Sequence, residues 1–376
     1  SVLFNRFTEF AKFTNPFYGG FDGVNILDED QFYFKDRAFS SDVNGKGGAV
    51  GDSPGGAGIG LCELPDAAGN DKNQAGQGRI NNNVASTRRA VEIMTDPMSV
   101  NTNILCIPGI RDTFVSDHAL VTTKAYSQAI YLMDLIKYDE DGNRLYDDST
   151  ARTDVRETSE AFEARALDNN YGATFYPDVY INDPVNNQVV KVPSSVAALG
   201  TLGFNDKVAF PWFAPAGFNR AGLDFVVNVE NRLTSDDRDT LYDARINPIA
   251  VFPRAGIVIF GQKTLQMNKS ALDRINVRRL MLEVKRQVVR VADKILFEPN
   301  TSQTRARFVS QVTPLLALIQ AQAGVEQFKV VMDETNNTTE DVEANKLNGR
   351  IVVVPTRAIE FIAVDFIIAN SGVSFD

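Results

Sequence analysis

The chain is poor in the side chains on which most enzymes and metal proteins depend. Its 376 residues include one histidine, His118, and two cysteines, Cys62 and Cys106. A single histidine excludes most metal sites and most histidine-dependent catalysis, because both require imidazole together with further ligands or a proton relay. Two cysteines in unrelated contexts allow at most one disulfide and are typical of a reducing compartment.

Long apolar runs and an excess of positive charge are also missing. No stretch approaches the roughly 20 apolar residues that a membrane-spanning helix needs, so we expect no membrane insertion. The formal net charge is −10, which argues against direct nucleic-acid binding because phosphate contacts require clustered Lys and Arg. The length of the chain predicts two or three domains.

Two loops resemble ligand sites but lack the residues that such sites need. Residues 51–60 (GDSPGGAGIG) carry no Gly-Lys-Ser/Thr ending and follow no apolar strand, so we interpret them as part of a flexible Gly-rich insertion near 40–80. Residues 139–142 (DEDG) lack the alternating ligands and closing glutamate of a calcium loop. We therefore predict no cofactor and no metal site.

Helical and extended patterns alternate along the first two thirds of the chain. We expect helices at 84–94, 116–136, 155–167 and 233–241, and strands at 104–107, 173–180, 189–192 and 256–260. This alternation predicts βαβ units around a largely parallel sheet. The aromatic stripe at 1–16 predicts a further amphipathic helix, and Trp212 a core anchor.

The stretch 246–300 has the strongest pattern. Ser270 can cap a helix that Pro299 ends. Its apolar residues recur at alternating steps of four and three: Val277, Met281, Val284, Val288, Val291 and Ile295. Its other faces are basic: Arg278, Arg279, Lys285, Arg286, Arg290 and Lys294. This basic face is either a solvated surface or a docking site for an acidic partner, since complementary charge orients assembly.

A second α+β region follows that helix. We expect a helix at 305–323, kinked or starting late because of Pro314, and strands at 329–333, 350–354 and 361–368. The last strand is apolar and β-prone, and an unpaired edge of this composition invites aggregation, so a partner strand is expected.

The order and spacing of motifs in 246–300 resemble the signature region of the contractile-tail sheath proteins of bacteriophages and related injection machines. The matching elements are an Asn-Pro-Ile turn, a glycine-bounded strand, a G-x-x-T-L element, an N-V-R-R-L helix and an F-E-P-N turn. Here they are Asn247 to Ile249, Gly256 to Phe260, Gly261 to Leu265, Asn276 to Leu280 and Phe297 to Asn300. Looser matches occur at 19–23, 192–195 and 211–217, with Ser194 where the family commonly has a second proline.

The resemblance, which covers residues 17–376, implies a fold and a function. It implies a subtilisin-like α/β sheath domain at 17–268 and a smaller α+β C-terminal sheath domain at 269–376, with 1–16 as a remnant of a longer chain. Such protomers stack as hexameric rings around the tail tube and contract to drive the tube through the host envelope, delivering the genome. The implied protein is a non-enzymatic virion component that is assembled in the host cytoplasm.

The resemblance also implies partners and an interface. The partners are further copies of the chain, the tail tube protein, and the baseplate and tail terminator proteins. In the family, terminal arms of neighbouring protomers add strands to the C-terminal sheet. The strand expected at 361–368 is either the resident strand of that sheet or the donated one. The candidate assembly interface is therefore the basic helix face together with four residues of the last strand: Phe361, Val364, Phe366 and Ile368.

Two alternatives remain open. A subtilisin-like fold containing His118 and Ser195 allows a serine hydrolase, although Ser195 lies in V-P-S-S and not in a nucleophile turn such as G-x-S-x-G. The other alternative is a non-contractile capsid or surface protein, which would form closed shells or sheets instead of tubes.

Overall fold

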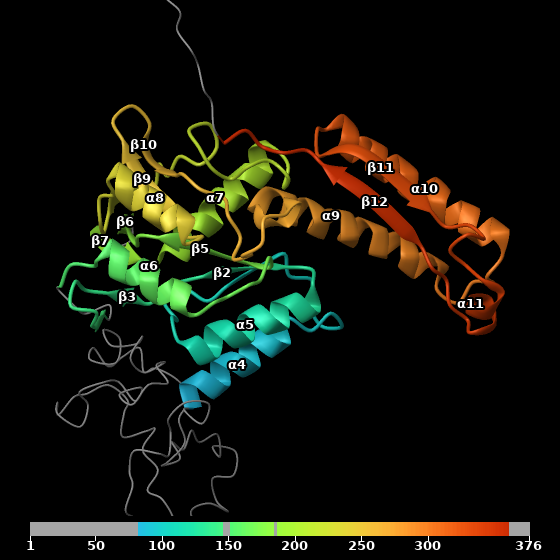
Figure 1. The fold of residues 1–376 in the computed structure, drawn as a ribbon, viewed down its shortest axis with the longest axis horizontal. Coiled ribbons are helices and arrows are strands. Elements are labelled where there is room, and N and C mark those ends of the chain that lie inside the picture. The colour runs from blue at the N-terminus through green and yellow to red at the C-terminus, as the bar shows by residue number, and fades with distance from the viewer. Residues whose placement is uncertain (1–81, 146–150, 184–185, 361–376) are drawn as a thin grey trace, which may run out of the picture.

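A computed structural model describes residues 82–145, 151–183 and 186–360. Figure 1 shows a layered body of helices around a sheet, from which a second group of helices and strands extends. We call residues 82–273 the sheet unit and residues 275–355 the C-terminal unit. Two clusters of buried apolar side chains lie on the faces of the central sheet, and a third fills the C-terminal unit.

The sheet unit is built on five strands in the order β1-β2-β5-β9-β10. They are β1 (Ile104–Cys106), β2 (Ile130–Met133), β5 (Gly172–Tyr176), β9 (Asn247–Phe252) and β10 (Gly256–Ile259). The first four run parallel, and β10 returns antiparallel to β9. The expected largely parallel sheet is confirmed.

Helices cover both faces of this sheet, as parallel strands require. They are α4 (Asn82–Met94), α5 (Thr113–Tyr126), α6 (Val155–Ala164), α7 (Ser194–Val208) and α8 (Ser235–Asp243). Side chains of β2 alternate between the faces: Ile130 and Leu132 join the cluster that contains α7, whereas Tyr131 and Met133 join the cluster that contains α5, α6 and α8. The central strands are therefore buried on both sides.

Short strands frame the carboxyl edge of the sheet. They are β3 (Lys137–Tyr138), β4 (Arg144–Leu145), β6 (Val179–Asp183), β7 (Gln188–Val192) and β8 (Val226–Val229). β3 and β4 form a hairpin, and β7-β6-β8 is an antiparallel sheet. β3 and β6 begin a few residues after β2 and β5 end, so both small sheets lie where the parallel strands finish.

The expected helix at 116–136 is wrong in its second half. Ser127 adopts a left-handed conformation (φ 53°), and its N–H donates to the Thr123 carbonyl, which ends α5 at Tyr126. Residues 130–133 then form β2, a central strand whose four residues are all buried. A strand buried on both faces has no polar alternation, so its apolar run continued the helical pattern.

Two further expectations are corrected. The single strand expected at 173–180 is two strands, because β5 ends at Tyr176 and Pro177 lacks the N–H that a ladder needs. Helix α7 was missed, because Gly200 and Gly203 lie within it and lower its helical propensity.

The C-terminal unit contains α9 (Ile275–Ala292), α10 (Ser302–Ala321), β11 (Val325–Val331), α11 (Thr339–Glu343) and β12 (Arg350–Pro355), with 3-10 turns at Ala271–Asp273 and Asp293–Ile295. β11 and β12 pair antiparallel. Trp212 of the sheet unit is buried in this core, and its indole N–H donates to the Gln322 carbonyl at 3.1 Å. The anchor role predicted for Trp212 is confirmed.

The long helices differ in detail from expectation. Ser270 caps the 3-10 turn and α9 begins only at Ile275. Pro314 lies within α10 on its exposed side, and the helix starts early, at Ser302, because Thr301 caps it. The expectations for 1–81 and for the strand at 361–368 lie outside the described residues.

Candidate functional site

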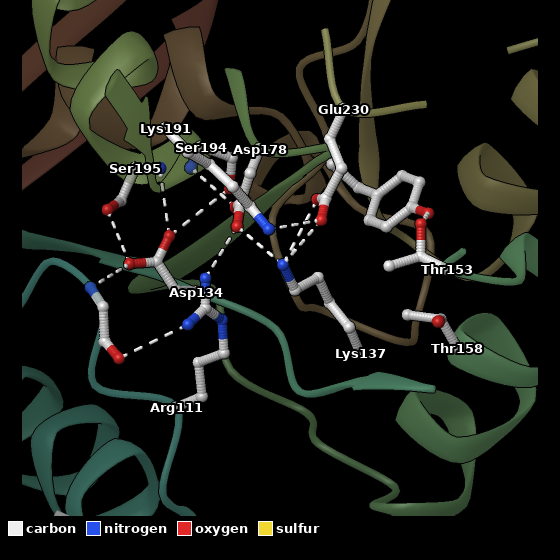
Figure 2. A network of polar contacts seen from close by, with 12 residues as sticks. Arg111, Asp134, Lys137, Thr153, Thr158, Asp178, Lys191, Ser194, Ser195 and Glu230 are labelled. Atoms are coloured by element: carbon white, nitrogen blue, oxygen red, sulfur yellow. Dashed lines mark hydrogen bonds and ion pairs between the residues drawn. The ribbon is translucent and has the colours of Figure 1, made fainter. Parts of the chain in front are cut away.

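The candidate site lies past the carboxyl ends of β2 and β5, the edge where parallel α/β sheets place their ligand sites. Asp134 follows β2 directly, and Asp178 follows β5 after Pro177. The amino end of α7 brings Ser194 and Ser195 to the same edge (Figure 2). Residues from distant parts of the sequence therefore meet here.

Asp134 is 1% exposed and accepts four hydrogen bonds. The donors are the N–H groups of Gly109 and Ser195, each at 3.0 Å, and the hydroxyls of Ser194 at 3.3 Å and Ser195 at 2.8 Å. Burial raises the pKa of this carboxyl, and the positive charge of Arg111 opposes that shift. Both carboxyl oxygens are thus occupied by groups of the protein itself.

Asp178 is the centre of the buried ion pairs. It accepts from Arg111 Nη2 at 2.7 Å, from Lys137 Nζ at 3.0 Å and from the Ser194 N–H at 3.1 Å. Burial acts to raise the pKa of Asp178, but the charges of Arg111 and Lys137 outweigh it and hold the pKa at about 2. Asp178 is therefore ionised at neutral pH.

The pairing continues outward through Glu230. Its carboxylate accepts from Lys137 Nζ at 2.9 Å and from Lys191 Nζ at 2.7 Å. Burial lowers the pKa of Lys137, but Asp178 and Glu230 raise it more, so the net shift is upward. We call the three cations and three carboxylates the buried charge network: Arg111, Asp134, Lys137, Asp178, Lys191 and Glu230 (Figure 2).

This network occupies the edge where an enzyme of this architecture would bind its substrate. Removing ions from water costs several kcal/mol each, and only close pairing of opposite charges offsets that cost. The signs alternate from Arg111 through Asp178 and Lys137 to Glu230, so each charge faces an opposite one. The arrangement fixes β2, β5, β6 and α7 to one another.

The geometry argues against the serine-hydrolase alternative. Ser195 is fully buried, and its hydroxyl donates to the Asp134 carboxylate. His118 lies on α5, where its ring contacts Arg88 at 3.3 Å and Glu92 at 3.4 Å. A catalytic triad requires the histidine to contact the serine hydroxyl, and here the acid takes that place.

Sequence reasoning did not find the buried charge network. Asp134 fell inside the helix expected at 116–136, and Asp178 inside the strand expected at 173–180. The available signal was an acid directly after a buried apolar run at each position. Recognising it requires the strand ends to be known first.

Of the six basic residues of the expected interface, Arg278 and Arg279 are buried within the chain. Arg278 and Arg279 are each 6% exposed. Arg278 stacks over the Tyr171 ring, with 4.1 Å from its guanidinium carbon to the ring centroid, and Arg279 pairs with Asp206 at 2.5 Å. Both therefore join α9 to the sheet unit, because this end of the helix is covered on two sides.

The other four basic residues are more exposed: Arg286 is half-buried, whereas Lys285, Arg290 and Lys294, the last in the 3-10 turn that follows α9, are exposed. Lys285 donates to the Ser127 hydroxyl, and Arg286 pairs with Glu283 at 2.7 Å. Arg290 and Lys294 are exposed, and no ion pair joins either to another residue in the part of the chain that the structure describes. The other interface candidates, Phe361, Val364, Phe366 and Ile368, lie outside the described residues.

Two further observations bear on partners. Within 82–145, 151–183 and 186–360, acidic, cysteine and histidine residues form no cluster of three or more that could hold a metal ion. Over the same residues, every helix is too short or too polar to cross a bilayer.

Comparisons with known proteins agree with one another. The family described as phage tail sheath C-terminal domain matches residues 268–369. The tail sheath protein of Vibrio phage KVP40 is 37% identical over 196 residues, which are 52% of this chain and 29% of that protein. The tail sheath protein of Enterobacteria phage T4 is 31% identical over 210 residues, covering 56% of this chain and 32% of that protein. The chain thus spans about a third of the length of these relatives.

Solved structures share the fold. The sheath complex of an extracellular contractile injection system in the contracted state superposes with a TM-score of 0.57 at 19% identity, covering 75% of this chain and 74% of that one. The baseplate of the anti-feeding prophage in the contracted state gives a TM-score of 0.54 at 25% identity, covering 68% and 69%.

The edge of the sheet is thus filled by paired charges of the protein itself. The sequence matches point to one family: residues 268–369 match the phage tail sheath C-terminal domain, and the chain is similar to the tail sheath proteins of phages KVP40 and T4.

Proposed function

We propose that this chain is the core of a contractile tail sheath protomer, a component of the phage tail. Its copies would stack as hexameric rings around the tail tube and contract to drive the tube through the host envelope. The observation that carries the proposal is the 37% identity to a tail sheath protein. The fold shared with a sheath complex in the contracted state supports it.

Contraction would be a shift between two packings of the same folded subunit, without fuel hydrolysed by the sheath. The buried charge network supports this proposal because it makes the sheet unit rigid, so movement falls on contacts between copies. We place the boundary between a subtilisin-like α/β domain and the C-terminal domain near residue 269, close to the start of the matching family region.

The C-terminal sheet would be the meeting point between protomers. Among the described residues it has two strands, and a sheet of this size is marginal without further pairing. A strand from a neighbouring copy would extend it by β-augmentation. The residues 361–368 are our candidate for the exchanged strand. The tube, baseplate and tail terminator proteins are the further partners of the proposal.

Electron microscopy of the full-length protein tests this function. We expect striated hollow tubes that form from the purified protein alone. Closed shells or flat sheets would favour the capsid or surface alternative. A protein that stays monomeric at all concentrations would contradict the proposal.

A further inference from the structure

The chain crosses between its two units twice, at neighbouring places. It leaves the sheet unit through residues 273–275 and, after β12, residues 356–360 return to it (Figure 1). We call residues 356–360 the return segment. It has little packing of its own: Ile359 is 83% exposed, and residues 357–360 line a cavity together with Lys263, Lys269 and Asn276.

Glu360, the last residue of the return segment, has a carboxylate that is surrounded by hydrogen-bond donors of the sheet unit and of the outgoing crossing. Its carboxylate accepts from Arg274 Nε at 2.6 Å and Nη2 at 2.9 Å, from the Tyr242 hydroxyl at 3.1 Å and from Gln262 Nε2 at 3.1 Å. The Glu360 side chain is 18% exposed. A two-pronged arginine–carboxylate contact is among the strongest and most directional of protein hydrogen bonds.

The residues that hold Glu360 are themselves fixed. Arg274 forms an antiparallel bridge with Lys263 on the outgoing crossing. There the Ile275 N–H donates to the Gln262 carbonyl at 2.8 Å, and the Thr264 N–H to the Asp273 carbonyl at 2.9 Å. The Arg274–Glu360 pair therefore joins the outgoing crossing to the return, across 86 positions of the chain.

Among the described residues, the four hydrogen bonds at the Glu360 carboxylate are the main attachment of this segment to the sheet unit, and the Thr356 N–H, which donates to the Gly324 carbonyl at 3.2 Å, holds its other end to the C-terminal unit. We propose that Glu360 is a clip that fixes the return segment to the sheet unit and so sets the position from which the chain continues beyond residue 360. The inference deepens the proposed function, on which it rests, because residues 361–368 are the candidate exchanged strand. A strand that starts from a fixed point pays less ordering entropy when it pairs with a neighbour.

Trypsin digestion tests the clip directly, because Arg357 is an exposed cleavage site within the return segment. Cleavage of a local segment tracks the population of its open form. In Glu360→Gln the carboxylate charge is lost while the size is kept, and we expect cleavage at Arg357 to be about tenfold faster, since charge-assisted hydrogen bonds are about twice as strong as neutral ones. Tyr242→Phe removes one of the four hydrogen bonds, and about a threefold increase is expected.

The matched control is Glu326→Gln, which alters an exposed glutamate of β11 in the same unit. Its cleavage rate at Arg357 should equal that of the wild type. Equal rates in Glu360→Gln and the wild type would overturn the clip, whether or not the protein forms tubes.

Assembly of the full-length protein gives the second readout. If the wild type forms tubes, Glu360→Gln should form them at least several-fold more slowly than the wild type and than Glu140→Gln, which alters an exposed glutamate of the β3–β4 turn, with an unchanged thermal unfolding midpoint. Normal tube formation by Glu360→Gln would overturn the role of the clip in assembly and leave the proposed function standing. Absence of tubes from the wild type would instead sink the proposed function, and the trypsin rates would still decide whether the clip exists.

Discussion

The sheet unit contains a buried network of paired charges, whereas the far end of the first long helix of the C-terminal unit carries exposed cations without an ion pair among the described residues. The sheet unit buries Arg111, Lys137 and Asp178 to 5% exposure or less and pairs them with one another. The C-terminal unit keeps Arg290 and Lys294 on its surface, and its two-stranded sheet exposes Val352 and Val354 to more than 40%. Charges that are paired inside the chain fix its fold, whereas exposed charges and exposed valines are available to other molecules. Among the described residues, the sheet unit is therefore held together by its own paired charges, and the two-stranded sheet of the C-terminal unit is where we expect a neighbour to add a strand.

Disrupting the buried charge network has the largest expected effect on stability and tests whether the sheet unit depends on these paired charges. Asp178→Asn leaves the Arg111 and Lys137 charges buried with weaker partners, and we expect a loss of about 3–5 kcal/mol in the free energy of unfolding. Urea denaturation measures it. The control, Asp141→Asn in the exposed β3–β4 turn, should change stability by less than about 0.5 kcal/mol. A loss below about 1 kcal/mol for Asp178→Asn would show that the sheet unit does not depend on the network.

Acid provides a second way to discharge the same carboxylate. The pKa of Asp178 in the folded chain is about 2, below its ordinary value of 3.8. A lowered pKa contributes stability above the unfolded value and loses it as the pH falls through the folded value. The stability advantage of the wild type over Asp178→Asn should therefore shrink by about 2 kcal/mol between pH 5 and pH 2.

Urea titrations of both proteins across that range measure the difference between them. The comparison is needed because Asp134 acts in the opposite direction. Its raised pKa favours the folded state as pH falls. Burial, the largest cause of this shift, is common to both proteins, and the smaller part that comes from the Asp178 charge is present only in the wild type. A pH-independent gap between the two proteins would contradict the role assigned to Asp178.

Ser195 separates a structural from a catalytic interpretation of the sheet edge. Ser195→Ala removes a hydroxyl bond to the buried Asp134 carboxylate, which should cost about 1–3 kcal/mol. A fluorophosphonate probe should leave Ser195 of the wild type unlabelled. Ser310→Ala, at an exposed serine of α10, is the matched control and should stay within about 0.5 kcal/mol of the wild type. Labelling of Ser195 would revive the hydrolase alternative.

The sequence predicted the layers of this fold better than its edges. Alternating patterns identified α4, β1, α6, α8 and β10, and with them the parallel sheet. The left-handed turn at Ser127 carries no glycine, so the end of α5 and the start of β2 were hidden. The buried charge network was not predicted for the same reason. Its two aspartates follow strand ends by one or two residues, and the sequence patterns did not locate those strand ends.

The basic helix α9 also shows what sequence patterns cannot predict. Periodicity separated its apolar stripe from its charges, and Val277, Val284, Val291 and Ile295 are buried as expected. It could not show that α9 lies between two units, so that a second side of the helix is also covered. Arg278 and Arg279 were therefore assigned to a surface that they do not reach.

The smallest expected change in stability sharpens the comparison within this one helix. The double variant Arg290→Glu with Lys294→Glu reverses two exposed charges, and its free energy of unfolding should stay within about 0.5 kcal/mol of the wild type. Arg279→Glu, the matched buried reversal, faces Asp206 and should lose several-fold more. If the exposed end of α9 meets an acidic surface of the tube or of the next ring, the double variant should slow tube assembly or release the inner tube, because like charges then oppose docking. Sedimentation and electron microscopy of the full-length protein measure both effects. Unchanged assembly and tube retention would mean that Arg290 and Lys294 contact only solvent. The C-terminal unit would then contact neighbouring copies through its sheet and not through these two cations.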